Sequence, residues 1–478
     1  MTNLKILTEL MKKFLEEKPY YLLIEDKYPI LHNLLINKLN TIRSTEYIFN
    51  LRKIIGDEYS NGYNDMDRNY KLSYPKDHHS HNNNQIEWYY IVGNFIHKNN
   101  KYGIQFVIMI YDLFPEHFLN KNNINKKYGR VFQILIAITI NDKTFTIDTP
   151  IYTYFENNCS TSTNGDIFEI KIDDTIFRSD NIDDIFPLNI KSKIKSNINF
   201  EINAKFDKLK PLFENGHNGQ CPCIDGLGSY YYSYSKIIAK SLYLKIDNEI
   251  INLENTGSFW FDHQWNMKGL MYQGIPKSLV FRASNNLIKS TTYGWDWLMI
   301  QLDDNTEYTI SSPINKKKYI NNIDDKIEQI IYFKKIDKNG YSSELTKSKM
   351  ILTDWFKFQE IYWPKKWIIY ISNERIIYAS NNNESIINDH RLNYDYKETP
   401  IIITTSDNIN GTGYAESIGY QTNNKHKREV LSKYFDIDEI YFKPTKTSKL
   451  LILLSGIFLF FNFGYFIIKI IFELYNWS

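Results

Sequence analysis

The stretch "GSFWFDHQWN" (257–266) sets an aspartate beside a histidine among four large aromatic residues. Its length and aromatic content are typical of a β-strand. Successive side chains of a strand point to opposite faces, so Trp260 shares one face with Asp262 and Trp265 shares the other with His263. We therefore expect Asp262 and His263 to point apart and to form no simple catalytic dyad unless a bulge intervenes.

A second strand, "GWDWLMIQL" (294–302), repeats this arrangement. Alternation places Trp295 and Trp297 on one face and Asp296 on the other. Burial among aromatic rings raises the pKa of a carboxyl and keeps it a proton donor near neutral pH unless a cation pairs with it. The same surroundings suit a buried structural acid, so the sequence leaves both roles open for Asp296 and for Asp262.

Two more strands set an acid among aromatic residues, since "IEWYYIVGN" (86–94) holds Glu87 and "GYAESIGY" (413–420) holds Glu416. An aromatic wall with a few convergent polar groups is what small-ligand pockets need. The strands therefore predict one or two ligand cavities. The catalytic candidates are Asp262, Asp296, His263 and Glu87. The ligand-binding candidates are the aromatic, amide and carboxyl side chains of the same strands: Trp88, Tyr90, Trp260, Trp265, Trp295, Trp297, Gln301, Tyr414 and Glu416.

The chain has 478 residues, which is long enough for two domains. Its 57 Lys and Arg against 55 Asp and Glu give a formal net charge of +2, so no strong positive field indicates a nucleic-acid partner. Tyr, Phe and Trp make up 16% of the residues, which favours strands over helices. Short apolar runs and hairpin-like turns between residues 70 and 440 predict a mainly β body of antiparallel barrels or sandwiches.

No phosphate-binding loop, dinucleotide fingerprint, metalloprotease motif or hydrolase elbow occurs in a fitting context. The only histidine cluster is "DHHSH" (77–81), which lies before the first clear strand. Imidazoles this close together can converge on a metal ion, but no further ligand group is evident near them, and a structural zinc site needs four ligands. We therefore expect a solvated or capping loop, with neither a metal nor a cofactor.

The N-terminal stretch "MTNLKILTELMKKFLEEK" (1–18) has apolar residues at helical spacing and charges on the other face. More helical pattern follows Pro29, so residues 1–65 are expected to form a short helical extension. An amphipathic helix of this kind packs against its own body or binds another protein. Residues 1–60 are the segment that we would assign to a protein partner.

Residues 450–468, "LLILLSGIFLFFNFGYFII", contain no charged side chain. A helix of this length, at 1.5 Å per residue, crosses roughly 30 Å of hydrocarbon. No signal-peptide pattern occurs at the N-terminus. We therefore expect one transmembrane helix at 450–468, which anchors the chain by its tail and contacts the lipid bilayer. The body would be cytosolic, and residues 469–478 would form a short tail beyond the membrane.

Five segments in sequence order resemble a known family: "DHHSHNNNQIEWYYIVGNF" (77–95), "YYYSYSKI" (230–237), "GSFWFDHQW" (257–265), "GWDWLMIQLDD" (294–304) and "GTGYAESIGY" (411–420). They are similar to the lipocalin-like family that includes carotenoid 1,2-hydratases, bacterial AttH-type proteins and fungal decalin-forming Diels–Alderases. The matching segments span about residues 75–422. The resemblance implies two consecutive lipocalin-like antiparallel β domains, at 70–275 and 276–440, with an apolar ligand space.

The resemblance also implies a hydrophobic ligand, such as a lipid, an isoprenoid or a polyene, and leaves the chemistry open between hydration and cyclisation. A hydratase needs an acid that protonates an alkene, for which Asp262 or Asp296 would serve, and aromatic faces that stabilise the cation. A cyclase needs only a shaped cavity and one or two hydrogen bonds. The alternative is a non-catalytic structural or interaction protein on a cellular membrane. Because the chain is rich in Asn, Ile, Lys and Tyr, the residues that A/T-rich codons encode, a virion membrane is the other location that we consider.

Overall fold

The computed structural model describes residues 3–16, 37, 39–41, 44–55, 62–64, 66, 67, 69–154, 157–224, 227–267, 295–313, 325–344, 348–358, 361–372, 374–382, 384, 387–389, 394–418 and 420. The chain divides into two compact units, Met1–Ile275 with Thr291–Thr422, and Pro276–Ser290 with Asn423–Ser478. The expected membrane span at 450–468 and the tail at 469–478 lie outside the described residues. Within the described residues, no helix combines the length and the apolar character needed to cross a bilayer.

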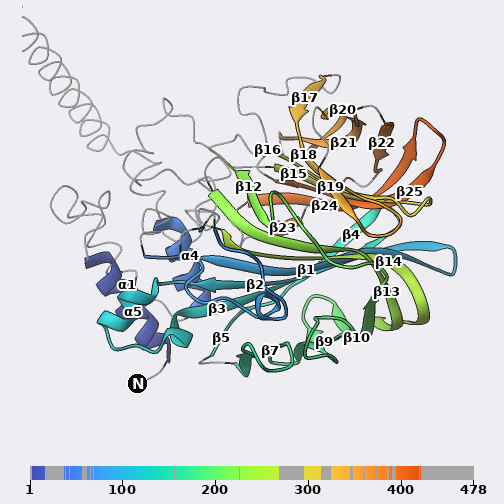
Figure 1. The fold of residues 1–478 in the computed structure, drawn as a ribbon. Coiled ribbons are helices and arrows are strands. Elements are labelled where there is room, and N and C mark those ends of the chain that lie inside the picture. Colours follow the sequence, from blue (N-terminus) through green and yellow to red (C-terminus); the bar gives the residue numbers. More distant parts are fainter. Residues whose placement is uncertain are drawn as a thin grey trace, which may run out of the picture. The chain divides into compact units, whose positions relative to one another are not determined.

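Two antiparallel sheets make up most of the described part of the first unit, so the protein is mainly β (Figure 1). The strands of the first sheet follow the order β4-β3-β2-β1-β14-β13-β10-β9-β8-β7-β6, while β5 pairs with β3, and β11 and β12 pair with β13. The bounds are β1 (Ile86–His97), β2 (Asn100–Asp112), β3 (Arg130–Ile140), β4 (Lys143–Ile147), β5 (Ile151–Thr153), β6 (Cys159–Thr161), β7 (Glu169–Ile172), β8 (Thr175–Ser179), β9 (Leu188–Lys195), β10 (Asn199–Lys208), β11 (Phe213–Glu214), β12 (Gln220–Ile224), β13 (Leu227–Ile246) and β14 (Glu249–Met267).

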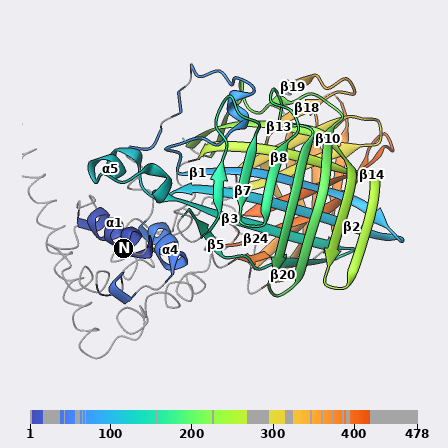
Figure 2. The ribbon, with the colours of Figure 1, turned by 90° about the horizontal axis from the view of Figure 1, so that it is seen from below.

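The first sheet folds over its own apolar core, because β7 to β10 run across β1 to β3 (Figure 2). Residues of both layers meet in one buried cluster, in which the Phe106 ring of β2 lies 5.2 Å from Phe177 of β8 and 6.3 Å from Phe200 of β10. Alternate residues of β1, among them Tyr89 and Ile91, point into this cluster. The period of two that the sequence shows is therefore what builds the core.

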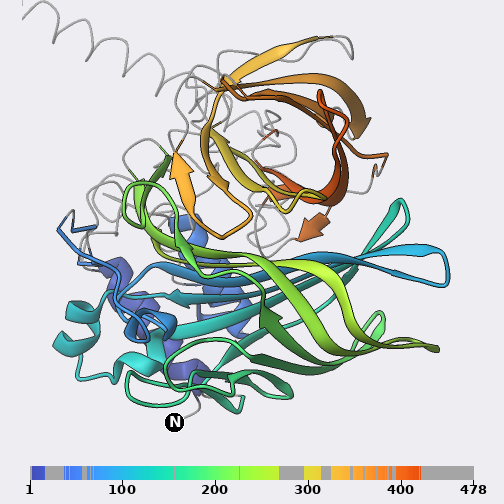
Figure 3. The same cartoon turned by 45° about the vertical axis from the view of Figure 1, so that its right-hand side comes forward.

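The second sheet has the strand order β17-β20-β21-β22-β24-β25-β15-β16-β18-β19, with β23 paired to β24. It curls round a separate apolar core (Figure 3). The bounds are β15 (Trp295–Leu302), β16 (Glu307–Pro313), β17 (Ile327–Ile330), β18 (Tyr332–Ile336), β19 (Ser342–Glu344), β20 (Lys349–Phe358), β21 (Ile361–Tyr370), β22 (Ile376–Ser380), β23 (Ile387–Asp389), β24 (Tyr394–Thr405) and β25 (Asn410–Ile418).

The asparagine-rich composition has a structural use in the turns between these strands. Among the described residues, nine of the twelve non-glycine positions with a positive φ are asparagines. Asn99 between β1 and β2 and Asn141 between β3 and β4 are examples, with φ of 68° and 54°. Asparagine tolerates this left-handed conformation better than most residues, so it closes the hairpins that the antiparallel order needs.

Among the described residues helices are few, and two of them lie in the expected N-terminal extension. They are α1 (Asn3–Glu16) and α4 (Thr45–Ile55), and the short helices α5 (Glu116–Lys121), η2 (Lys76–His78) and η3 (Lys126–Gly129) follow. The Phe14 ring of α1 packs 5.1 Å from that of Phe118, and Arg52 of α4 donates to the carbonyl of Leu113 at 2.8 Å. The apolar face of α1 is thus covered by its own chain, which favours packing over partner binding.

Candidate functional site

Asp262 and His263 lie on opposite faces of β14, as strand alternation predicts. In the pairing of β14 with β1, His263 is opposite Tyr89 and Asp262 is opposite Tyr90. His263 points into the first core and contacts Glu87, whereas Asp262 points the other way. The two neighbours therefore belong to different surroundings, which are described in turn.

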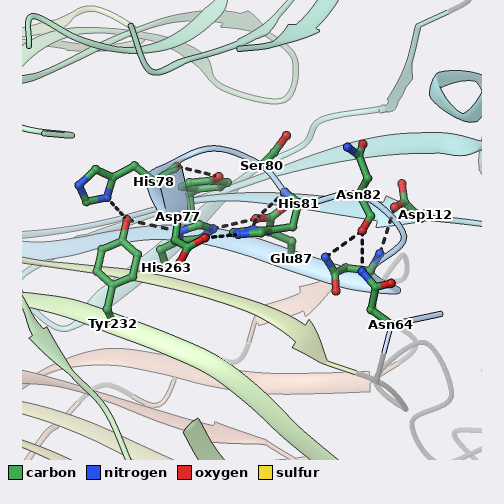
Figure 4. A network of polar contacts seen from close by, with 12 residues as sticks. Asn64, Asp77, His78, Ser80, His81, Asn82, Glu87, Asp112, Tyr232 and His263 are labelled. Carbon is green, nitrogen blue, oxygen red and sulfur yellow. Dashed lines mark hydrogen bonds and ion pairs between the residues drawn. The ribbon is translucent and has the colours of Figure 1, made fainter. Parts of the chain in front are cut away.

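Glu87 is the centre of a buried cluster of imidazoles (Figure 4). Its Oε1 accepts from Nδ1 of His81 at 2.7 Å and from Nε2 of His263 at 2.8 Å, and its Oε2 accepts from the backbone N–H of His81 at 2.9 Å. Glu87 is only 1% exposed. One carboxylate thus holds two histidines that lie 182 residues apart in sequence (263 − 81).

The cluster continues on both sides of Glu87. On one side Nε2 of His81 faces Oδ1 of Asp77 at 3.4 Å, and the hydroxyl of Tyr70 donates to the same oxygen at 2.6 Å. On the other side the hydroxyl of Tyr232 lies 3.3 Å from Nδ1 of His263 and 2.8 Å from Nδ1 of His78. We call this set the histidine network. Its members are Tyr70, Asp77, His78, His81, Glu87, Tyr232 and His263.

The charges of the network follow from burial and from these contacts. Burial alone would raise the pKa of Glu87, but the charge of His81 and the hydrogen bonds from both imidazoles outweigh it and lower the pKa to about 2. Burial alone would lower the pKa of His81, but Glu87 and Asp77 outweigh it and raise the pKa. At His263 burial outweighs the hydrogen bond and charge of Glu87, and at His78 it outweighs the charge of Asp184, so both pKa values are lowered, that of His78 to about 3. His81 is therefore the imidazole held as a cation, between two carboxylates.

Aromatic rings fix the orientation of the two central imidazoles. The ring of His81 stacks on Trp265 with centroids 4.1 Å apart and planes 6° apart, and Tyr89 stacks on His263 at 4.0 Å. A cationic imidazole gains from an aromatic face at this distance. The side chain of His81 is 18% exposed, whereas those of Glu87 and His263 are buried, so of these three side chains only that of His81 is open to solvent.

His81, Glu87 and His263 each offer an atom that could ligate a metal, and these atoms lie within 4.8 Å of one another. The nitrogen-to-oxygen distances of 2.7 and 2.8 Å are those of charge-assisted hydrogen bonds. Zinc bonds of about 2.1 Å at tetrahedral angles would hold the ligand atoms roughly 3.4 Å apart. The side chains would have to separate to admit a metal, so the arrangement suits shared protons better.

A small cavity adjoins the loop that carries His81. Its volume is about 120 Å³, well below the roughly 300 Å³ at which small-ligand pockets begin. Arg130 lines it, forms a salt bridge with Asp112 at 2.8 Å, and donates to the carbonyl of His81 at 2.6 Å. The remaining lining is largely polar: Asn82, Asn83, Glu116, Asn125, Lys126, Lys127, Tyr154 and Thr161, with Phe114 and Leu119.

Asp262 is sealed by hydrogen-bond donors rather than open to a ligand. It accepts from Tyr231 at 2.6 Å, from Ser233 at 2.5 Å and from the indole of Trp260 at 2.6 Å. Burial raises the pKa of Asp262 to about 7, although these three donors oppose the rise. The hydroxyl of Tyr231 also accepts from Trp297 of the second sheet at 3.2 Å, so one of the groups that seal Asp262 joins the two sheets.

Asp296 is sealed in the same manner within the second core. Its oxygens accept from Ser417 and from Tyr420, each at 2.6 Å, and it has no exposed surface. Burial raises the pKa of Asp296 to about 6, against the effect of both hydroxyls. Neither Asp262 nor Asp296 reaches the histidine network.

The structure separates the predicted ligand-binding residues into groups. Trp265 stacks on His81 of the histidine network. Trp88 is half-buried and lies on the face of β1 opposite to Glu87. Others bond where the two sheets meet: Tyr90 donates to Glu398, and Gln301 donates to the carbonyls of Ser235 and Phe259. Elsewhere in the second sheet Trp295 donates to Glu416 at 2.8 Å, while Tyr414 is buried beside Gly103 of the first sheet.

Of the solvated or capping loop expected at "DHHSH", the solvated part is wrong. Asp77, His78 and His79 are buried, because the loop packs across the ends of β1, β13 and β14 and its side chains bond there. Sequence analysis therefore missed Asp77, His78, His81, Tyr232 and Tyr70 as site residues. The histidine cluster was visible in the sequence. Its carboxylate partner, Glu87, was assigned to a separate strand and was not connected with the cluster.

We expect Asp262→Asn to lower the free energy of unfolding by about 1–3 kcal/mol, since a buried amide cannot accept from all three donors. Asp296→Asn should lower the free energy of unfolding by a similar amount. Urea denaturation measures both. An unchanged free energy of unfolding together with lost turnover would instead make Asp262 the catalytic acid that the sequence suggested.

The fold is similar to that of a solved structure, and the sequence matches a family profile. A structure from Nitrosomonas europaea, described as an AttH, is similar with a TM-score of 0.56 and 19% identity, over 74% of this chain and 99% of that chain. Kievitone hydratase from Nectria haematococca gives a TM-score of 0.48 and 13% identity, over 76% of this chain and 97% of that one. No curated protein matches the chain in sequence. The sequence profile described as AttH-like matches residues 65–420, which is most of the chain, and the protein therefore belongs to the AttH-like family.

Proposed function

We propose that the chain binds a small hydrophobic molecule and that the histidine network transfers protons in the hydration of an alkene. The observation that carries the proposal is His81, a cationic imidazole that lies between Glu87 and Asp77, stacks on Trp265 and reaches the surface. The resemblance to carotenoid 1,2-hydratases supports this chemistry. It also supports a lipocalin-like form for each sheet, with the ligand held against the aromatic residues.

The geometry indicates which proton moves. Nδ1 of His81 is held by Glu87 at 2.7 Å, whereas Nε2 faces Asp77 at 3.4 Å, a longer and weaker contact. The Nε2 proton would pass to one alkene carbon, and a water molecule would add to the other. That water would return its second proton to Nε2, so that the sum is addition of one water across the double bond. A cyclisation could use the same donor, and product analysis separates the two.

We expect His81→Gln to reduce turnover at least about 100-fold, because general acid–base groups contribute factors of this size. The full-length chain in detergent is incubated with farnesol, squalene or lycopene in H₂¹⁸O, and products that carry ¹⁸O are measured by mass spectrometry. His117→Gln is the matched control, since His117 is exposed and lies outside the network. Equal turnover by the two variants would exclude His81 as the donor.

One observation favours a non-catalytic role instead. The cavity beside the network is small and lined largely by polar residues, and both sealed aspartates are fully bonded. A structural or interaction protein on a cellular or virion membrane would need neither a large ligand cavity nor an aspartate free to donate a proton. Absence of ¹⁸O incorporation from every alkene, together with capture of a defined protein partner by the full-length chain, would support this alternative.

We propose further that residues 450–468 anchor the chain in a membrane as a tail anchor with the body in the cytosol. The uncharged stretch of 19 residues supports the anchor. One observation runs against the cytosolic side, because Cys221 is disulfide-bonded and disulfides are rare in reducing compartments. Extraction at alkaline pH tests the anchor, and protease protection of residues 1–445 in intact membranes tests the side.

A further inference from the structure

Within the described residues, the core of the second sheet contains a buried lysine that forms no ion pair with a carboxylate. Lys397 of β24 is 1% exposed, and it points to the same side of the strand as the core residues Ile401 and Ile403. Its ammonium donates to Oδ1 of Asn381 at 2.8 Å and to the carbonyl of Pro364 at 3.2 Å. Neither acceptor is charged, and within the described residues no ion pair joins Lys397 to a carboxylate.

Asp296, which lies in the same row of paired residues as Lys397, does not form an ion pair with it. Ser417 of β25 pairs with Lys397 on one side and with Asp296 of β15 on the other, so the three residues form a row across three strands. Both oxygens of Asp296 already accept hydrogen bonds, from Ser417 and Tyr420. The row therefore holds one acid, Asp296, whose two oxygens both accept hydrogen bonds, and one amine, Lys397, that no carboxylate contacts within the described residues.

Around Lys397 the unsatisfied groups are donors. Nδ2 of Asn381 has no hydrogen-bond partner among the described residues, although its Oδ1 accepts from Lys397. The indole N–H of Trp363, next to Pro364 in sequence, also has no hydrogen-bond partner within the described residues. A buried donor without an acceptor costs free energy, and charging a buried amine that has no anion beside it costs more. What this end of the core lacks is an acceptor, preferably an anionic one.

The side chains around Lys397 indicate what kind of group must be attached to the missing anion. Phe356 presents its ring to the ammonium at 4.5 Å, a cation–π distance, and Trp363, which pairs with Phe356, and Trp355, which pairs with Pro364, contribute further buried apolar surface. A hydrated inorganic anion would leave this aromatic surface without a partner. A carboxylate at the end of an apolar chain would satisfy the donors and the aromatic residues together.

We propose that Lys397, with the side-chain amide of Asn381 and the indole of Trp363, binds the carboxylate of an apolar carboxylic acid in the core of the second sheet. Burial lowers the pKa of Lys397 well below its ordinary value, which is consistent with an amine that becomes charged when the anion arrives. This site is separate from the histidine network of the first sheet. It therefore does not depend on the proposed hydration.

The test compares decanoate with methyl decanoate, which keeps the apolar chain but loses the charge. Both are titrated into the full-length chain in detergent by isothermal calorimetry, and [1-¹³C]decanoate is followed by NMR. We expect the ester to bind at least tenfold more weakly than the acid, because hydrogen bonds to charged groups contribute factors of this size. Binding of acid and ester with equal affinity, or no binding of decanoate, would overturn the proposal.

Variants locate the site. Lys397→Met should weaken decanoate binding at least tenfold and remove the ¹³C shift of the bound carboxylate, while Lys365→Met should change neither. Lys365 is the matched control, because it lies nearby on β21 but is partly exposed and already paired with Glu384 at 3.1 Å. Unchanged decanoate binding by Lys397→Met would overturn the assignment to Lys397. Should that variant fail to fold, the comparison of acid and ester in the unaltered chain still decides.

Discussion

Replacing Glu87 with glutamine is expected to lower the free energy of unfolding by about 3–5 kcal/mol near pH 6, the cost of removing one partner of a buried ion pair. Glu87 accepts from both imidazoles and from the backbone N–H of His81. A glutamine amide would turn an N–H₂ group toward some of these donors. His81 would keep only the longer contact with Asp77. Urea denaturation monitored by tryptophan fluorescence measures the loss.

The pH profile identifies the interaction. The folded pKa of Glu87 is depressed to about 2 from 4.5, so its contribution is present above pH 4.5 and is lost as the pH falls toward 2. The folded pKa of His81 is raised above 6.5, so its contribution is present below pH 6.5 and is lost as the pH rises through the folded value. The difference between the unaltered chain and Glu87→Gln should therefore be largest between pH 4.5 and 6.5.

Glu169→Gln is the control for this variant. Glu169 pairs with Arg178 at 2.6 Å on the surface, where the two side chains are 28% and 51% exposed. Exposed pairs of this kind contribute about 0–1 kcal/mol. A Glu87→Gln variant that loses no more stability than Glu169→Gln, or whose loss is the same at every pH, would show that the histidine network does not hold the folded chain together.

The sequence predicts which face of its strand each site residue occupies, but it does not predict which residues of different strands meet. Side-chain alternation is a local property, so it correctly separates Asp262 from His263 and places Glu87 on the face of Tyr89. Which residue of β14 lies opposite which residue of β1 is a matter of register between strands distant in sequence. The contact between Glu87 and His263 depends on that register and could not be predicted from either strand alone.

The histidine loop and the buried acids show the same limit. The cluster at 77–81 has the composition of a solvated loop, and only its packing against β1 and β14 makes it a site. Likewise, aromatic neighbours indicate that Asp262 is buried, but Tyr231 and Ser233, which seal it, come from the neighbouring strand β13. Local sequence predicts which groups are desolvated, whereas tertiary structure decides what they bond to.

Replacing Lys210 with methionine is expected to cost about 3–5 kcal/mol of stability, because it leaves a buried carboxylate without its cation. Lys210 follows β10 of the first sheet, and its ammonium donates to Glu307 at 2.5 Å and to the carbonyls of Asn305 at 2.6 Å and Asp337 at 2.7 Å. All three acceptors belong to the second sheet or its turns. The side chains of Lys210 and Glu307 are 7% and 0% exposed, so water cannot replace the lost bonds.

The pH dependence of this loss separates a buried charge from lost packing. Burial raises the pKa of Glu307 to about 7 from 4.5, although Lys210 opposes the rise. An acid with a raised folded pKa takes up a proton on folding, so stability falls as the pH rises from 4.5 toward 7. Without Lys210 the folded pKa of Glu307 would be higher still, and the fall would extend to higher pH. Lys210→Met should therefore cost more at pH 8.5 than at pH 6.

Two further variants complete this experiment. Adding Glu307→Gln to Lys210→Met removes the buried charge, so the double variant should recover stability at pH 8.5 and lose the pH dependence. Lys205→Met is the control, because Lys205 pairs with Asp180 on the surface, where the side chains are 43% and 45% exposed, and such a pair contributes at most about 1 kcal/mol. A Lys210→Met variant that matches this control would mean that the contacts of Lys210 with the second sheet do not stabilise the fold.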